Sequence, residues 1–240
     1  MVRFNWHFYA LSFLFISSAI FLVHFIPQEF QIYIKIFGFL VAVSTSVSLF
    51  VSYYVYDYSN FYKFHWLMSR PAKGNVFVNV NAGFDDTSQA LKMLFNPSKF
   101  IALDFYNANK HTEVSIKRAR KAYPSNPNTI SVSTVLLPLA NKSVDNLFVI
   151  FSAHEIRDEH ERVSFFKELN RVIKPTGKIF ITEHLRNLPN FLAFNIGFFH
   201  FYTKSAWLKT FQLAQLEIEN EIPYTPFIST FLLKPYGNTI

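Results

Sequence analysis

Two histidine–glutamate pairs are the side chains of this sequence best suited to acid–base chemistry. His154 and Glu155 follow one predicted buried strand, and Glu183 and His184 follow the next. Because imidazole and carboxylate groups exchange protons in the pH range where enzymes work, His154, Glu155 and His184 are the candidate catalytic residues. A purely structural loop pair is the alternative interpretation at each place.

These histidines do not form a recognisable metal motif. The zinc motif His-Glu-x-x-His fails after His154 and Glu155, because the position that should carry the second histidine is Asp158. The next histidine, His160, lies six residues after His154 and would face another side of a helix. The chain has no cysteine, which excludes thiolate sites and disulfides. The sequence therefore predicts no metal site.

A second group of polar residues lies nearer the N-terminus. The run 79–85, Asn-Val-Asn-Ala-Gly-Phe-Asp, begins inside a predicted strand and continues into a loop, and Asp104 ends the next strand. Glycine lets the backbone approach a ligand closely, and Asn and Asp best tolerate the left-handed backbone that glycine otherwise supplies. A carboxylate such as Asp104 accepts two hydrogen bonds at once. The structural alternatives are a turn at Gly83, a helix cap at Asp85 and a solvated strand end at Asp104.

Alternating strand and helix signals place these residues at one edge of a sheet. The run 147–151 is unbroken and apolar, as expected of a central strand covered on both faces. Five strand–helix steps followed by two closing strands predict a doubly wound, seven-stranded α/β sheet with an antiparallel edge, in which ligands bind beyond the carboxyl ends of the strands. The predicted strands are 75–80, 100–104, 129–132, 147–151, 178–182, 217–222 and 227–233, and the predicted helices are 87–95, 112–122, 158–173 and 191–216, the last broken near Gly197.

One stretch in the middle of the chain resembles a known family. It begins with Leu-Pro-Leu at 137–139, continues through Asp145 and His154, and ends in Glu-Leu-Asn-Arg-Val-Ile-Lys-Pro-Thr-Gly-Lys at 168–178. In residue types and spacing it is similar to the class I S-adenosylmethionine-dependent methyltransferases, and in particular to their type 11-like domain. The resemblance covers residues 75–233 and implies a Rossmann-like methyltransferase fold.

The resemblance implies S-adenosylmethionine as the cofactor and methyl transfer as the reaction. Asp104 would accept hydrogen bonds from the ribose hydroxyls, and Gly83 is the middle glycine of the family's Asp/Glu-x-Gly-x-Gly-x-Gly loop. Asn79 takes the place of the acid in that loop, and Ser133 falls where the family has an acid near the adenine. The predicted cofactor-binding residues are Asn79, Asn81, Gly83, Asp85, Asp104, Ser133, Thr134 and Ser152.

Two uncharged apolar stretches in the first quarter of the chain predict a membrane hairpin. Residues 8–26 and 36–56 contain no Asp, Glu, Lys or Arg, and each stretch is long enough to cross a hydrocarbon core of about 30 Å. Basic residues flank the pair at Arg3 and Lys63, so the positive-inside tendency puts both ends in the cytoplasm. A cleaved signal peptide at the first stretch and buried core helices are the alternatives.

The predicted plan is a transmembrane hairpin at 1–56, a juxtamembrane connector at 57–74 and a methyltransferase-like domain at 75–240. The net charge of +7 favours anionic lipid, nucleic acid or an anionic cofactor as a partner. The densest basic cluster, 117–121, lacks interleaved aromatic residues. We therefore expect a solvated or headgroup-facing helix there and no nucleic-acid site.

Together these features predict a two-pass membrane enzyme with its catalytic domain on the cytoplasmic side. A site held at the bilayer predicts a lipophilic or membrane-associated small-molecule acceptor, and the Phe-rich run 191–202 either lines its pocket or forms a core helix. The depleted glycine loop favours an alternative, a catalytically inactive methyltransferase-fold scaffold or partner-binding protein. A doubly wound enzyme with a nicotinamide cofactor is a third interpretation. The sequence indicates neither the methyl acceptor nor the oligomeric state.

Overall fold

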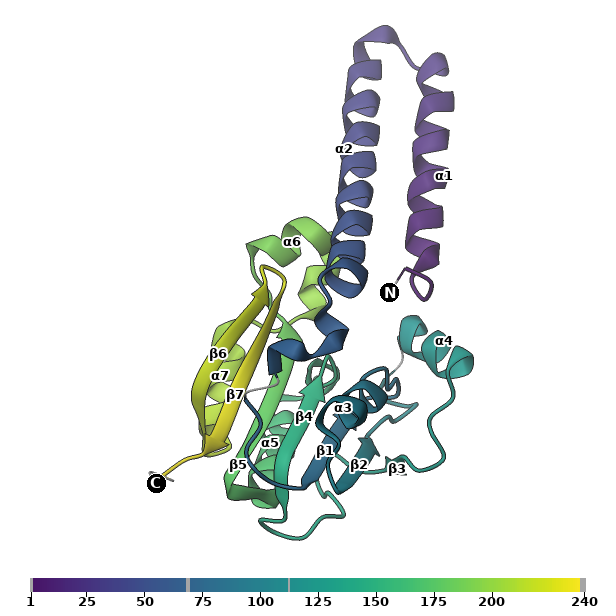
Figure 1. The fold of residues 1–240 in the computed structure, drawn as a ribbon. Helices are drawn as coiled ribbons and strands as arrows, with labels where there is room; N and C mark the ends of the chain where they lie inside the picture. Colours follow the sequence, from purple (N-terminus) through teal and green to yellow (C-terminus); the bar gives the residue numbers. More distant parts are fainter. Residues whose placement is uncertain (1, 68–69, 112, 238–240) are drawn as a thin grey trace.

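The computed structural model describes residues 2–67, 70–111 and 113–237. A helical hairpin stands on a seven-stranded sheet that is flanked by helices (Figure 1). The hairpin consists of α1 (Trp6–Leu22), the 3-10 turn η1 (Val23–Phe25), α2 (Gln28–Tyr53) and the π-helical turn η2 (Tyr54–Tyr58). The remaining elements are η3 (Phe61–Lys63), η4 (His65–Leu67), β1 (Val76–Asn81), α3 (Ser88–Phe95), β2 (Lys99–Asp104), α4 (Val114–Ala122), β3 (Ile130–Ser131), β4 (Val144–Ile150), η5 (Ala153–Glu155), α5 (Glu159–Val172), β5 (Ile173–His184), α6 (Leu188–Phe194), η6 (Asn195–His200), α7 (Lys204–Leu213), β6 (Leu216–Thr225) and β7 (Ile228–Pro235).

The strand order of the sheet is β3-β2-β1-β4-β5-β7-β6. Strands β1 to β5 pair in parallel, and β7 runs antiparallel to both β5 and β6. This arrangement confirms the predicted doubly wound sheet with an antiparallel edge. Every residue of β4 is buried, because the sheet is covered on both faces at its centre. The carboxyl ends of β1, β2, β4 and β5 therefore form one edge on which a site can be built.

The strand β5 begins earlier than the sequence predicts. Ile173 already pairs with Val144, and the register then shifts before the regular pairing with β4 resumes. The Lys-Pro-Thr-Gly segment is thus a bulge within the strand. Gly177 lies close to β4, since a Cβ atom there would be only 2.9 Å from the carbonyl oxygen of Asp145. At the other edge β3 is shorter than predicted and spans only 130–131.

The long helix predicted at 191–216 is three separate pieces, α6, η6 and α7. Asn195 ends α6 in the left-handed region with a φ of +50°. Thr203 begins α7 by accepting a hydrogen bond at Oγ1 from the backbone N–H of Ala206, at 3.2 Å. Large apolar side chains are exposed along α6 and η6 at Leu188, Phe191, Leu192, Ile196 and Phe199.

Two apolar clusters fill the two faces of the sheet. Helices α5 and α7 cover one face, where Phe165 and Trp207 are fully buried. The other face is covered by α3, α6 and the turns η3 and η4, which bury Phe61 and Phe64 to 1% exposure or less. Within the segment 57–74, expected as a connector, residues 61–67 therefore pack into the core of the domain.

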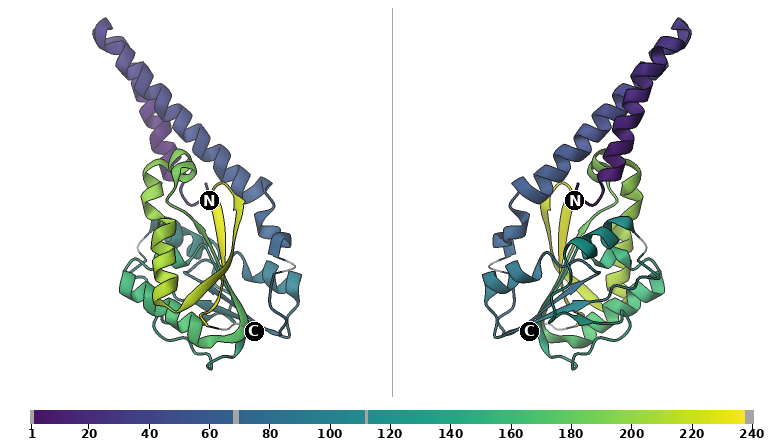
Figure 2. Two further views of the ribbon diagram at one scale, coloured as in Figure 1. Left: turned by 90° about the vertical axis from the view of Figure 1, so that its left-hand side faces the viewer. Right: turned by 90° about the vertical axis from the view of Figure 1, so that its right-hand side faces the viewer.

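Helices α1 and α2 lie side by side and project away from the sheet (Figure 1, Figure 2). By length and composition both Trp6–Phe25 and Gln28–Lys63 can cross a membrane, and only 6% of the apolar window of each is buried. Phe13, Phe39 and Phe50 expose 73%, 66% and 68% of their surface. The core helices of a soluble domain bury such side chains, so this exposure argues against the buried-core alternative.

Asp145 joins three segments at the amino ends of the strands, and its loss should destabilise the fold. Its Oδ2 accepts hydrogen bonds from the backbone N–H groups of Asn75 and Val76 at 3.1 and 2.9 Å, and its Oδ1 lies 2.7 Å from Nζ of Lys174. Burial opposes ionisation, but the hydrogen bonds from Lys174 and Val76 outweigh it and lower the pKa of Asp145.

We expect Asp145→Ala to lower the free energy of unfolding by about 2 kcal/mol, because buried donors lose their acceptor. Chemical denaturation of the full chain in detergent micelles measures the change. Glu219→Gln, on the exposed edge strand β6, is the control, and an equal loss in that variant would contradict the role of Asp145.

Candidate active site

The loop after β1 is shaped by its own polar side chains. Asn81 donates from Nδ2 to the carbonyl of Leu103 at 3.0 Å, and its Oδ1 accepts a hydrogen bond from the backbone N–H of Gly83 at 3.1 Å. Gly83 has a φ of +101°, and a Cβ atom there would lie 2.7 Å from the ring of Tyr106. Both facts require glycine at this position. Asp85 accepts hydrogen bonds from the N–H groups that begin α3, which is the helix-capping alternative.

Asn79 is buried beneath this loop. Its Nδ2 donates to the hydroxyl oxygens of Thr87 and Ser88 at 2.9 and 2.8 Å. Its Oδ1 has no donor within the part of the chain that the structure describes. Because a buried acceptor without a partner is costly, a donor supplied by a ligand would be favoured here.

Asp104, at the end of β2, is buried and already paired. Its Oδ1 accepts a hydrogen bond from the backbone N–H of Tyr106 at 2.8 Å, and its Oδ2 lies 2.6 Å from Nη1 of Arg120. Arg120 also donates to the carbonyl of Gly83 at 3.1 Å, and its guanidinium lies 4.3 Å from the ring centroid of Tyr106. This arginine therefore bridges the loops after β1 and β2.

The other predicted cofactor residues make contacts within the chain. Thr134 donates from Oγ1 to Oε1 of Glu161 at 2.6 Å, and Ser152 donates to the carbonyl of Val80 at 2.9 Å. Ser133 is exposed and forms an isolated bridge with Leu136. The roles of these three residues towards a cofactor stay predictions.

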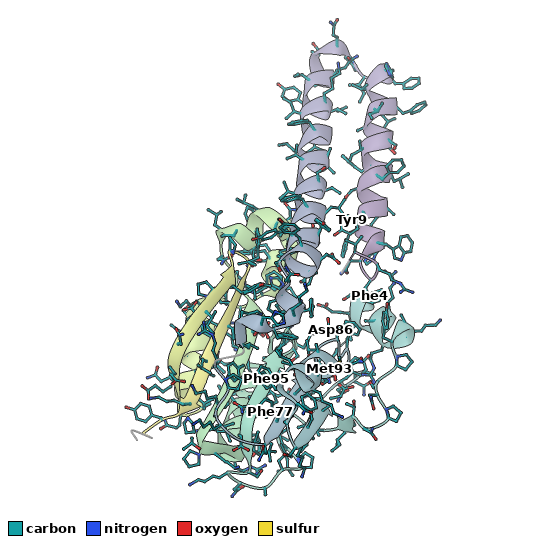
Figure 3. The ribbon with its side chains drawn as sticks, viewed as in Figure 1. Phe4, Tyr9, Phe77, Asp86, Met93 and Phe95 are labelled. Carbon is teal, nitrogen blue, oxygen red and sulfur yellow. The ribbon has the colours of Figure 1, made fainter. Side chains whose placement is uncertain are left out.

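Both ends of the hairpin stand on this edge of the sheet. At the start of α1, the ring of Phe4 packs against Phe84 of the β1 loop with 5.6 Å between centroids, and Arg118 of α4 donates to the carbonyl of Phe4 at 2.8 Å. Phe4 lies between the foot of α1 and α4 (Figure 3). After α2, the hydroxyl of Tyr56 lies 2.8 Å from Nε2 of His184. The hairpin thus contacts the ends of β1 and β5.

His184 is buried and engaged on both ring nitrogens. Nδ1 donates to the carbonyl of Phe227 at 2.9 Å, which leaves Nε2 as the acceptor for the hydroxyl of Tyr56. Burial lowers the pKa of His184 to about 4, and the hydrogen bond to Phe227 opposes that shift only in part. The neutral ring joins η2 to β5.

His154 lies in a chain of charged groups. Its Nδ1 is 2.6 Å from Oε2 of Glu183, and its Nε2 is 3.3 Å from Oε1 of Glu155. Burial alone would lower the pKa of His154, but the two carboxylates raise it to about 10. Burial alone would raise the pKa of Glu155, but hydrogen bonds from His154 and His200 lower it well below its usual range. An imidazole that is held protonated donates a hydrogen bond and does not act as a general base.

Sequence reasoning missed three residues that the structure brings to this edge. Arg120 was visible only as part of a basic cluster, and His200 only as part of the Phe-rich run 191–202. Tyr56 was visible only as an aromatic residue near a membrane boundary. Their partners are distant in the sequence, so no local spacing could have identified them.

The sequence matches a family of known proteins over much of the sheet. Residues 82–181 match the family described as methyltransferase domain. The matched range begins in the loop after β1 and ends within β5, so it includes Gly83, Asp104 and His154. No curated protein matches the sequence.

Solved structures share the fold at low sequence identity. The PH0226 protein from Pyrococcus horikoshii OT3 has a TM-score of 0.53 and 17% identity, and the alignment covers 75% of this chain and 91% of that one. An S-adenosylmethionine-dependent methyltransferase from Clostridium acetobutylicum has a TM-score of 0.52 and 12% identity over 76% of this chain and 92% of that one. A putative methyltransferase from Haloferax volcanii, solved in complex with the Trm112 methyltransferase activator, has a TM-score of 0.52 and 12% identity over 77% and 96%. The family match over residues 82–181 and this strand order confirm the predicted resemblance to the class I S-adenosylmethionine-dependent methyltransferases and the fold that it implies.

Proposed function

We propose that the chain is a membrane-anchored S-adenosylmethionine-dependent methyltransferase that acts on a lipophilic acceptor. The observation that carries the proposal is the pair of contacts between the hairpin and the sheet. Phe4 contacts the loop after β1, and Tyr56 contacts the end of β5. The hairpin therefore flanks the carboxyl edge of the sheet, where this fold binds ligands. With α1 and α2 in a bilayer, that edge faces the headgroup region, and a lipophilic acceptor reaches it without crossing bulk water.

A second apolar surface supports contact with a bilayer. Leu188 and Ile196 on α6 and η6 expose 68% and 81% of their surface. These elements adjoin α2, since Asn195 donates to the hydroxyl of Ser44 at 2.7 Å. Short apolar segments beside a membrane anchor typically lie in the interface between headgroups and acyl chains. We infer that α6 and η6 rest there, which adds a third interpretation for the run 191–202.

The charges around the hairpin support a cytoplasmic position for the domain. Arg3 precedes α1, and Lys63, Arg70 and Lys73 follow α2, while the turn between the helices has no comparable basic excess. Cytoplasmic segments next to membrane helices carry an excess of Lys and Arg. We therefore propose a two-pass protein with both ends of the hairpin in the cytoplasm.

The residues at the carboxyl edge of the sheet fit S-adenosylmethionine, although one of them, Asp104, already has a partner within the chain. Gly83 keeps the backbone that permits close approach, Asp104 is placed to accept the ribose hydroxyls, and Oδ1 of Asn79 remains as an acceptor for an amine. Arg120 competes because it already pairs with Asp104. The cofactor supplies an electrophilic methyl group, and the chain supplies orientation and exclusion of water. His154 and Glu155, which follow β4, are proposed to hold the polar end of the acceptor.

Calorimetry on the full chain in lipid nanodiscs tests the enzymatic part of the proposal. We expect S-adenosylmethionine and S-adenosylhomocysteine to bind with micromolar affinity, and NAD to give no heat of binding. Failure of both compounds to bind at millimolar concentration would overturn the proposal. The alternative, an inactive scaffold of the same fold, rests on the depleted glycine loop, is supported by the ion pair between Arg120 and Asp104, and predicts that failure.

Alkaline carbonate extraction of membranes that contain the full chain tests the anchoring. We expect the protein to stay with the lipid pellet, because two apolar helices hold it through the hydrocarbon core. Recovery in the supernatant would show that the hairpin is not inserted and would overturn the membrane part of the proposal.

A further inference from the structure

Three side chains with metal-ligand chemistry converge beyond β4. Nε2 of His154 and Nε2 of His200 lie 3.3 and 3.4 Å from the same oxygen, Oε1 of Glu155. The three ligand atoms all lie within 4.8 Å of one another. Bonds of about 2.0–2.1 Å around a tetrahedral ion separate its ligand atoms by about 3.3 Å. The two nitrogen–oxygen separations therefore suit such an ion.

Each imidazole in this cluster is oriented by a second carboxylate. Nδ1 of His154 lies 2.6 Å from Oε2 of Glu183, and Nδ1 of His200 lies 2.7 Å from Oε1 of Glu113. A ring that donates its Nδ1 hydrogen to a carboxylate keeps Nε2 free as a ligand, and this pairing accompanies most metal-binding histidines. Both Nε2 atoms here lie beside Glu155.

The charges around the cluster favour a divalent cation. Glu113, Glu155 and Glu183 contribute three negative charges, and Arg157, with Nη2 at 3.8 Å from Oε1 of Glu113, contributes one positive charge. A bound ion requires neutral imidazoles, so His154 releases the proton that it holds in the absence of the ion, and the sum is then two negative charges. Glu155 is only 8% exposed, so water screens these charges poorly, and a bound cation balances them in place of the proton.

We propose that His154, Glu155 and His200 bind a divalent transition metal, with Zn²⁺ as the ion that this donor set suits best. Two imidazoles and one carboxylate are a ligand set of catalytic zinc, which keeps a further position open for a small molecule. The sequence motif does not include this set, because the second histidine comes from η6 and not from the helix that carries His160.

Arg157 is the group that the ion displaces. Its Nη2 contacts both ring nitrogens of His200, Nδ1 and Nε2, and lies 2.7 Å from Nε2, the nitrogen that would bind the ion. Its Nη1 donates to the carbonyl of His200 at 2.7 Å. After displacement the guanidinium keeps that carbonyl and the ion pair with Glu113, so it is not left without partners.

The chemical role that we assign to the ion rests on the proposed function. A divalent ion at the open position lowers the pKa of an acceptor hydroxyl, which makes its oxygen a stronger nucleophile. That oxygen forms the new C–O bond to the methyl carbon, and its proton passes to solvent. The C–S bond breaks at the same time, and its electron pair stays on sulfur. The proposal therefore favours a lipophilic acceptor with an ionisable hydroxyl group.

Metal binding by the full chain in detergent micelles tests the site without any cofactor. After dialysis against a chelator, we expect one Zn²⁺ per chain by mass spectrometry of metal content, and visible absorption bands of four- or five-coordinate Co²⁺ on titration with that ion. His200→Ala should weaken binding at least about a hundredfold, and Glu113→Gln by about ten- to a hundredfold. His160→Ala, at the exposed start of α5, should leave it unchanged.

Two results would overturn the site. One is no ion bound by the unmodified chain at micromolar Zn²⁺, which would make the cluster a set of ion pairs joined by protons. The other is an equal loss in His160→Ala and His200→Ala. The outcome is separable from that of the proposed function, because a chain that binds Zn²⁺ but not S-adenosylmethionine keeps the metal site and loses the enzymatic proposal. A chain that binds only S-adenosylmethionine loses the metal site alone.

Discussion

Replacing Asp104 with asparagine should weaken the binding of S-adenosylmethionine by about a hundredfold. Asp104 is 6% exposed at the end of β2, and in the proposed complex both of its oxygens accept hydrogen bonds from ribose hydroxyls. Hydrogen bonds to a charged group contribute about 1.5–3 kcal/mol each, and asparagine offers one acceptor oxygen in place of two. Calorimetry in nanodiscs measures the dissociation constant, with Glu219→Gln as the exposed control.

The companion variant Arg120→Ala should change the affinity in the opposite direction. Arg120 holds Oδ2 of Asp104 at 2.6 Å, and its side chain is one-third exposed. Giving up such a partly exposed pair costs about 1 kcal/mol, so its removal should tighten binding about fivefold. Unchanged affinity in Asp104→Asn would show that the cofactor does not use this carboxylate. Weaker binding in Arg120→Ala would show that the arginine contacts the cofactor and does not compete with it.

Lowering the pH from 6.5 to 4 should destabilise the chain through His184. The pKa of His184 is about 4 in the folded chain, because the ring is buried, against 6.5 for an exposed histidine. Between these values the unfolded chain takes up a proton that the folded chain refuses. The contribution of His184 is therefore complete above pH 6.5 and is lost as the pH falls towards 4. A difference of about 2.5 pKa units corresponds to about 3 kcal/mol.

Urea unfolding followed by tryptophan fluorescence over this pH range measures the loss. His184→Gln does not titrate there, so its free energy of unfolding should lack this part of the acid dependence. Other titrating groups are common to both proteins, and the difference between the two curves isolates His184. Tyr56→Phe removes the hydroxyl donor but keeps the ring buried, and it should retain the slope. Parallel curves for the unmodified chain and His184→Gln would contradict the prediction.

The sheet could be predicted from the sequence because many local signals agreed. The unbroken apolar run 147–151 is the buried strand β4, and Gly83 has the left-handed backbone that a glycine in the first loop suggests. Asp85 caps a helix, as its position before a helical pattern indicated. Each of these properties depends on neighbours along the chain, so spacing and residue type were sufficient.

The pairs at the site could not be predicted, because they depend on contacts between distant segments. The bond between Arg120 and Asp104 joins α4 to β2, and the contact between His200 and Glu155 joins η6 to η5. Nothing in the local pattern distinguishes these residues from solvated charges. The packing of residues 61–67 could not be predicted for a related reason, since they face a sheet whose strands come later in the chain.

The contacts of both hairpin ends with the sheet domain matter for how the protein is assembled in a cell. Residues before α1 hold α4 through Arg118, and residues after α2 hold β5 through Tyr56, so both ends of the hairpin must reach the same compartment as the sheet. In the proposed membrane topology, an insertion error that left one helix outside the bilayer, or reversed one of them, would separate Phe4 from the β1 loop. In that topology, correct insertion of the hairpin and completion of the site are the same event.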